Sequence, residues 1–157
     1  MRRINLLLTV CILVLLVLCY QSVSAPMRFE KEKARREQVV KQHLTAIRTA
    51  EQQYCRLTGH YTEQLDSLVR LGLLKDSLCL IPYTQGERFE VTTTVEVGRS
   101  GKEIPLMECG ATYSSYLQGL DEASIANLTS RAGQAGTYPG LKIGDITTPN
   151  DNAGNWE

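Results

Sequence analysis

The sequence predicts an α+β protein in which an N-terminal transmembrane helix continues into a long helix packed on a small head with an antiparallel β-hairpin. Three observations support this fold class. Residues 4–20 carry no charge. Residues 27–57 contain neither glycine nor proline and are rich in good helix formers. Residues 87–97 alternate between two side-chain types, as a half-buried strand does. The expected parts are a membrane anchor (1–25), a stalk helix (26–57) and a head (58–157).

The charges of the chain balance, but they are unevenly placed. The 157 residues include 17 basic and 17 acidic side chains. Because nucleic-acid-binding proteins usually carry a basic excess, this balance argues against a nucleic-acid partner. Residues 28–48 hold seven basic and three acidic side chains, whereas residues 49–157 hold eight basic and fourteen acidic ones. A basic neck is therefore followed by an acidic head.

The N-terminal apolar run is typical of a secretory signal or a membrane anchor. Its seventeen residues would span about 26 Å as a helix, and residues 21–25 would complete the ~30 Å core of a bilayer. The small residues Val23-Ser24-Ala25 suit signal peptidase. Pro26 would follow the cut and disfavours it, and the run is longer than a typical signal core. We expect a retained anchor rather than a cleaved signal.

Positive charges on the two sides of the apolar run disagree about its orientation. Arg2 and Arg3 favour a cytoplasmic N-terminus, whereas the six basic residues between 28 and 41 would favour the reverse. Charge alone therefore leaves the orientation open. The seven basic residues between 28 and 48 are typical of a solvated helix face, and contact with anionic lipid headgroups is the alternative.

The second half of the stalk helix is expected to lie on the head. Its apolar residues recur at helical spacing: Val40, Leu44, Ile47 and Tyr54. Glu51 interrupts this row. The first half of the stalk has almost no apolar stripe, so it should be exposed to solvent.

Two glycines mark the next helix boundaries. Gly59 is expected to end the long helix. Thr62 should then cap a short helix over 63–71, with Leu65, Leu68 and Val69 facing inward. Gly72 should end that helix.

A β-hairpin is the clearest strand prediction. Residues 98–101 form a turn between the strand at 87–97 and its partner at 102–108. One face of the first strand is expected to be buried; it holds Phe89, Val91, Thr93, Val95 and Val97. Residues 78–83 are expected to form a short edge strand.

The last third of the chain is expected to hold one short helix and a loop-rich end. Asp121 can cap a helix over 122–131, with Ile125 and Leu128 facing inward. Residues 138–157 lack a regular pattern, although three of their apolar residues can pack on the head: Leu141, Ile143 and Ile146.

Cysteine spacing points to no metal site. Cys55, Cys79 and Cys109 are far apart and form no CxxC pattern. In an oxidising compartment one pair could form a disulfide, and Cys79–Cys109 is the first choice. Buried, reduced cysteines are the alternative.

Catalytic patterns are weak, and we expect no enzyme. The chain has two histidines, His43 on the long helix and His60 in the turn that ends it. Neither lies in a nucleophile or metal motif, and no phosphate-binding glycine loop is present. We therefore expect surface or packing roles for both and no bound cofactor, calcium apart.

The C-terminal loop carries the one cluster that could bind a metal. Asp145 and the run Asn150-Asp151-Asn152 offer oxygen ligands of the type that calcium prefers. The same residues are also ordinary turn chemistry.

The layout resembles type IV pilin-like proteins, and most closely the major pseudopilins of type II secretion systems. Residues 47–61 (IRTAEQQYCRLTGHY) resemble the end of the family's long helix and its Gly-x-Tyr turn, and Leu65, Leu68 and Leu71 follow as the next leucines do there. Residues 144–145 and 152–157, ending in Asn-Trp-Glu, resemble the family's calcium loop. The Gly-His-Tyr-Thr turn and the ending Ala-Gly-Asn-Trp-Glu resemble more closely a group of anchored envelope proteins of Gram-negative bacteria that share both features.

This resemblance implies a non-enzymatic envelope protein with a pilin-like head, acting as a structural or assembly subunit through its N-terminal helix. A stalked module that binds a glycan or a protein is the alternative. The resemblance also implies a cytoplasmic N-terminus, a head in the periplasm or outside the cell, and calcium at Asp145, Asp151 and Asn152. In the metal-free alternative, Trp156 docks on the head and Asn side chains close the loop. The chain departs from the family because residues 1–20 lack the prepilin peptidase motif.

Overall fold

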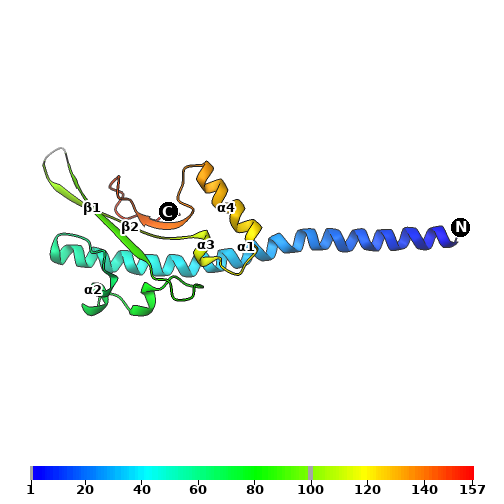
Figure 1. Ribbon diagram of the computed structural model, residues 1–157, viewed down its shortest axis with the longest axis horizontal. Coiled ribbons are helices and arrows are strands. Elements are labelled where there is room, and N and C mark those ends of the chain that lie inside the picture. Colours follow the sequence, from blue (N-terminus) through cyan, green and yellow to red (C-terminus); the bar gives the residue numbers. More distant parts are fainter. Residues whose placement is uncertain (1, 99–100) are drawn as a thin grey trace. The chain divides into compact units, whose positions relative to one another are not determined.

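The computed structural model has the predicted α+β class, with one long helix and one antiparallel sheet (Figure 1). It describes residues 2–98 and 101–157, and for residues 2–8 and 20–25 it describes the backbone alone. Two compact units make up the chain, Met1–Arg35 and Arg36–Glu157. The elements are α1 (Arg2–Thr58), α2 (Leu65–Arg70), the 3₁₀ helix η1 (Asp76–Cys79), β1 (Glu90–Val97), β2 (Glu103–Thr112), α3 (Tyr113–Tyr116), α4 (Glu122–Gln134) and β3 (Gly140–Gly144).

The first unit is helical, and α1 continues through Pro26 without interruption. The predicted helix over 27–57 is confirmed as a part of α1. Side chains from residue 9 to residue 19 are exposed. Among the residues that the structure describes, no helical segment combines the length and the apolar character needed to cross a bilayer.

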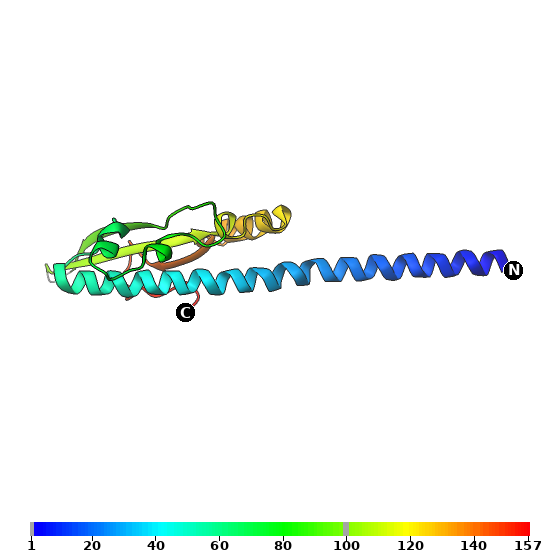
Figure 2. The same cartoon turned by 90° about the horizontal axis from the view of Figure 1, so that it is seen from below.

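The core of the second unit lies between α1 and the sheet. Val40, Leu44 and Ile47 are fully buried, which confirms the predicted apolar row. The sheet has the order β1-β2-β3, and both strand pairs are antiparallel. Its buried side chains include Met107 and Ile143, neither of which is exposed to solvent. Figure 2 shows α1 flanked by the α2–η1 segment on one side and by the C-terminal tail on the other.

The β-hairpin is confirmed, but one half of its expected buried face is exposed. Val91 pairs with Cys109, and Val95 pairs with Pro105. Phe89 and Val91 are 3% and 5% exposed, whereas Val95 and Val97 are 52% and 67% exposed. The prediction that the last two are buried is wrong, because exposure rises along β1 toward the loop end of the hairpin, which diverges from α1 (Figure 1). Of the predicted turn, residues 99 and 100 lie outside the described residues.

A third strand, β3, forms where the sequence predicted a loop. Leu141 pairs with Ala111 and Ile143 pairs with Cys109, so two of the three predicted packing residues lie in the core, while Ile146 is half-buried. Gly144 ends the strand with φ +71°, and a Cβ there would collide with the carbonyl oxygen of Met107. Glycine is required at that close approach of two strands.

Two local predictions for residues 62–83 are wrong. The backbone of 76–79 forms η1 rather than an edge strand, and only a single bridge joins Leu80 to Arg88. Helix α2 begins at Leu65, and the Thr62 hydroxyl accepts from the Gln64 N–H at 3.1 Å instead of capping the helix. Gly59 and Gly72 have φ of +85° and +71°, as expected for residues that end helices.

Helix α4 begins as predicted and extends three residues beyond the expected end. The Asp121 carboxylate accepts a hydrogen bond from the Ser124 N–H at 2.9 Å, which confirms the cap. Ile125 and Leu128 are half-buried. Cys79 and Cys109 are both buried and are not joined by a disulfide, which agrees with the alternative of reduced cysteines.

Candidate functional site

The predicted ligand Asp145 lies directly after β3 and organises the turn that follows. One carboxylate oxygen accepts from the N–H groups of Thr147 at 2.8 Å and Thr148 at 3.2 Å, and from the Thr147 hydroxyl. The other oxygen accepts from the Lys142 ammonium at 3.3 Å. The Thr147 hydrogen bonds, with help from Lys142, hold the pKa of Asp145 well below its usual range. Asp145 is therefore ionised and already surrounded by donors.

The other two predicted ligands make different contacts. Asn152 is 6% exposed, and its amide nitrogen donates to the Tyr61 hydroxyl at 2.8 Å. Asp151 is exposed, and both residues have positive φ, 54° for Asp151 and 57° for Asn152. Among the described residues, no group of three or more His, Cys, Asp or Glu side chains could hold a metal ion. Calcium binding stays a prediction.

The C-terminal tail completes the outer edge of β3. Main-chain N–H groups of Asn155 and Gly144 donate to Lys142 and Ala153, each at 3.0 Å. The Asn155 side chain adds two bonds, because its oxygen accepts from the Lys142 N–H at 3.1 Å and its nitrogen donates to the Gly140 carbonyl at 3.0 Å. An asparagine side chain thus takes the place of a strand's peptide group.

The tail also contacts α1. The Glu157 carboxylate pairs with Arg48 at 2.8 Å, and the Lys41 ammonium lies 5.5 Å from the centre of the Trp156 ring. Trp156 lies against Gly154, where a Cβ would come within 2.6 Å of the indole. These contacts have the form of the metal-free closure, in which Trp156 docks and Asn side chains hold the loop.

A buried carboxyl group, that of Glu51, lies on α1 near the turn that ends the helix. Glu51 is completely buried, and one of its oxygens accepts from the Thr62 N–H at 3.1 Å. Its other oxygen has no hydrogen-bond partner. Burial raises the pKa of Glu51 to about 7, although the Thr62 hydrogen bond opposes the shift. Glu51 therefore exchanges a proton near neutral pH rather than near pH 4.5.

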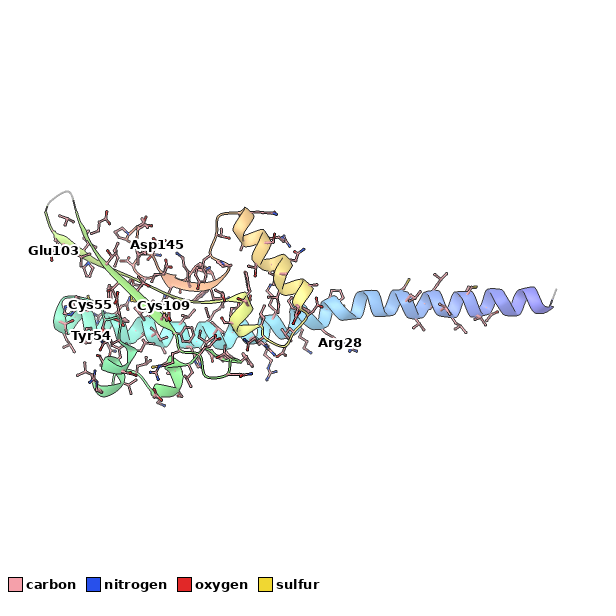
Figure 3. The ribbon with its side chains drawn as sticks, in the orientation of Figure 1. Arg28, Tyr54, Cys55, Glu103, Cys109 and Asp145 are labelled. Carbon is pink, nitrogen blue, oxygen red and sulfur yellow. The ribbon has the colours of Figure 1, made fainter. Side chains whose placement is uncertain are left out.

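Three neighbours of Glu51 also favour their neutral forms. Burial is the main cause of a raised pKa at Cys55, Tyr61 and Cys109, and the charge of Glu51 adds to each shift. Figure 3 labels Cys55 on α1, Cys109 on β2 and Asp145 after β3. Because a thiolate is the reactive form of cysteine, these thiols are poor nucleophiles at neutral pH. Glu51 can therefore take up or release a proton near neutral pH, while Cys55, Tyr61 and Cys109 stay protonated.

Glu51 lies in the predicted apolar row of the long helix, where the sequence indicated only a break in that row and not a buried carboxyl group. Its spacing of four residues from Ile47 was the available signal, because residues i and i+4 share one helix face. The sequence held no sign that Tyr61 and Asn152 meet, since they are 91 residues apart.

The ring nitrogens of the two histidines lie close to main-chain carbonyl groups. His43 Nδ1 lies 3.1 Å from the Leu80 carbonyl oxygen, and His60 Nδ1 lies 3.2 Å from the Thr58 carbonyl oxygen.

Comparisons with models of protein families, with curated proteins and with solved structures gave no match for this chain.

Proposed function

We propose that this chain is a non-enzymatic, membrane-anchored protein of the bacterial cell envelope, with a head that acts as a structural or assembly subunit. The N-terminus would be cytoplasmic, and the head would lie in the periplasm or outside the cell. Assembly would use the N-terminal helix, with copies of this chain or with other proteins.

One observation carries the anchor. Residues 13–18 are six consecutive apolar side chains, and each is 52–61% exposed. Six residues cover more than one helical turn, so apolar groups face outward all around the helix. Exposed apolar surface of that extent marks a membrane or protein contact. The uncharged stretch 4–25 would span about 33 Å as a helix, which matches a bilayer core.

The structural role is supported by the way polar groups in the second unit are used. The Asp145 carboxylate holds a turn, the Glu157 carboxylate fixes the tail to Arg48 on α1, and the Asp121 carboxylate caps a helix N-terminus. Such groups stabilise loops and helix ends. We infer that this unit presents a fixed surface rather than a reacting group.

Membrane extraction of the full chain tests the anchor. We expect the chain to remain in the membrane pellet after alkaline carbonate treatment. The double substitution Leu13→Arg and Leu16→Arg should release it, because two central charges disfavour insertion. Leu57→Arg with Leu71→Arg is the matched control, since both leucines are exposed but lie outside the apolar run. Release of the unmodified chain by carbonate would refute the anchor.

A groove beside α1 favours a second candidate, a stalked module that binds a glycan or a protein. It measures about 740 Å³ and is lined by Ala46, Thr49, Leu73, Leu74 and Leu78, among others. Chemical cross-linking in native membranes separates the two candidates. Ladders of cross-linked copies support assembly, and a single band at the mass of one chain supports the module.

A further inference from the structure

Two cations directly after the apolar run have no partner in the described part of the chain. Arg28 and Lys31 are exposed on α1. The nearby carboxylates turn elsewhere, because Glu30 pairs with Lys33 at 3.4 Å and Glu32 pairs with Arg35 at 3.3 Å. The side chains of Arg28 and Lys31 make no hydrogen bond or ion pair with any described residue. Their charges are therefore available to an anion outside the chain.

Helix geometry puts these charges on one face. At ~100° per residue, Arg28, Lys31 and Arg35 lie within about 60° of one another around the α1 axis. Glu30 and Lys33 fall on the other side of the helix. Side chains on an α-helix lean toward its N-terminus. The three basic side chains consequently lean back toward the apolar run.

The height of the charges matches the headgroup layer of a bilayer. Helix rise places Arg28 about 4.5 Å and Lys31 about 9 Å beyond Ala25, the last residue of the expected membrane anchor. The polar layer on each side of a bilayer core is roughly 5–8 Å thick. Both side chains can therefore reach lipid phosphates if residues 4–25 fill the apolar core.

We propose that Arg28 and Lys31 bind the phosphates of anionic lipid headgroups on the head side of the membrane. Arg35 adds to the same face at its outer end. Arginine pairs with a phosphate through two parallel N–H donors, whereas lysine acts as a point charge. This inference rests on the proposed anchor, and it names the class of lipid that the anchor prefers.

Spin-labelled lipids test the inference on the full chain. The protein is reconstituted in phosphatidylcholine vesicles that contain a trace of spin-labelled phosphatidylglycerol or spin-labelled phosphatidylcholine. The fraction of motionally restricted label gives the relative affinity for each headgroup. We expect the chain to prefer phosphatidylglycerol by at least about fivefold, the effect of roughly one charge at a membrane surface. High salt should reduce that preference.

The double substitution Arg28→Gln and Lys31→Gln should bring the preference close to one. Arg56→Gln with Lys75→Gln is the matched control. Both residues are exposed and lie in the second unit, and the two substitutions remove the same net charge as the first pair. Equal restriction of both lipids by the unmodified chain would overturn the headgroup inference and leave the anchor standing. A preference that survives the first double substitution would overturn the assignment to these residues. No restricted lipid of either kind would overturn the anchor as well.

Discussion

The buried carboxylate of Glu51 accepts a hydrogen bond from the main-chain N–H of Thr62 at 3.1 Å, across the turn that ends α1. This bond joins the helix to the segment that leads into α2. Because the second oxygen of Glu51 is buried without a partner, the protonation state of this group affects the stability of the second unit.

Stability should fall as the pH rises from about 4.5 to about 7. The pKa of Glu51 is about 7 in the folded chain, against 4.5 when it is exposed. The folded state therefore holds a proton that the unfolded state has lost, and folding weakens between pH 4.5 and about 7. The full effect is about 3 kcal/mol. Denaturant unfolding of the full chain in a mild detergent, followed by Trp156 fluorescence from pH 5 to 8, measures it.

Glu51→Gln is the control for this pH dependence. The amide keeps an acceptor for the Thr62 N–H and cannot ionise, so this part of the pH dependence should disappear. An unchanged profile in the variant would assign the pH dependence to another group.

Asn152→Ala should destabilise the chain by about 1–2 kcal/mol more than Asp151→Ala. Both residues have positive φ, so the backbone cost of alanine is shared. Asn152 alone is buried and bonded to Tyr61, and its loss leaves the phenol without that partner. Thermal unfolding of the two variants gives the comparison, and equal melting temperatures would show that the Tyr61 bond adds no stability.

Val91→Asp should cost several kcal/mol, whereas Val95→Asp should cost less than about 1 kcal/mol. The two valines lie on the same face of β1 and differ in exposure, 5% against 52%. An unpaired charge is severely destabilising only where it is buried. Chemical denaturation of both variants tests this, and similar losses would mean that the loop end of the hairpin is covered in solution.

Asp145→Ala should destabilise the turn after β3 by about 1–3 kcal/mol, because the N–H groups of Thr147 and Thr148 lose a charged acceptor. A calcium titration of melting temperature and Trp156 fluorescence separates this role from metal binding. No saturable response up to about ten millimolar, which is above the range of the calcium sites of extracellular modules, would leave only the metal-free closure, in which Lys142 pairs with Asp145. A saturable rise that Asp145→Ala removes would instead establish the calcium site.

The long helix, its buried row and the hairpin could be predicted because each follows from local periodicity. Val40, Leu44 and Ile47 repeat at the helical spacing, and helix burial follows directly from that pattern. Strand β3 could not be predicted in this way. It holds five residues and has glycine at both ends, and it exists because β2 offers an edge for pairing. The exposure of Val95 likewise depends on how the hairpin diverges from α1, which alternation does not encode.

The candidate site was predicted in composition but not in arrangement. Asp145 and Asn152 were identified as polar loop residues, yet their partners come from the neighbouring turn and from Tyr61. The position of Glu51 in the helical row could be read from the sequence. Its hydrogen bond with the Thr62 N–H could not, because that contact depends on how the chain turns after Gly59. Contacts of this kind require the tertiary structure.

The Asn155 side chain has a consequence for aggregation. An unpaired edge strand is a template on which other chains add, and proteins usually protect such edges. At β3 the donors and acceptors of Gly140, Lys142 and Gly144 are taken by Asn155 and Ala153. Residues 153–155 therefore protect the outer edge of β3. Removal of residues 155–157 would expose a strand edge on which β-sheet aggregates could nucleate.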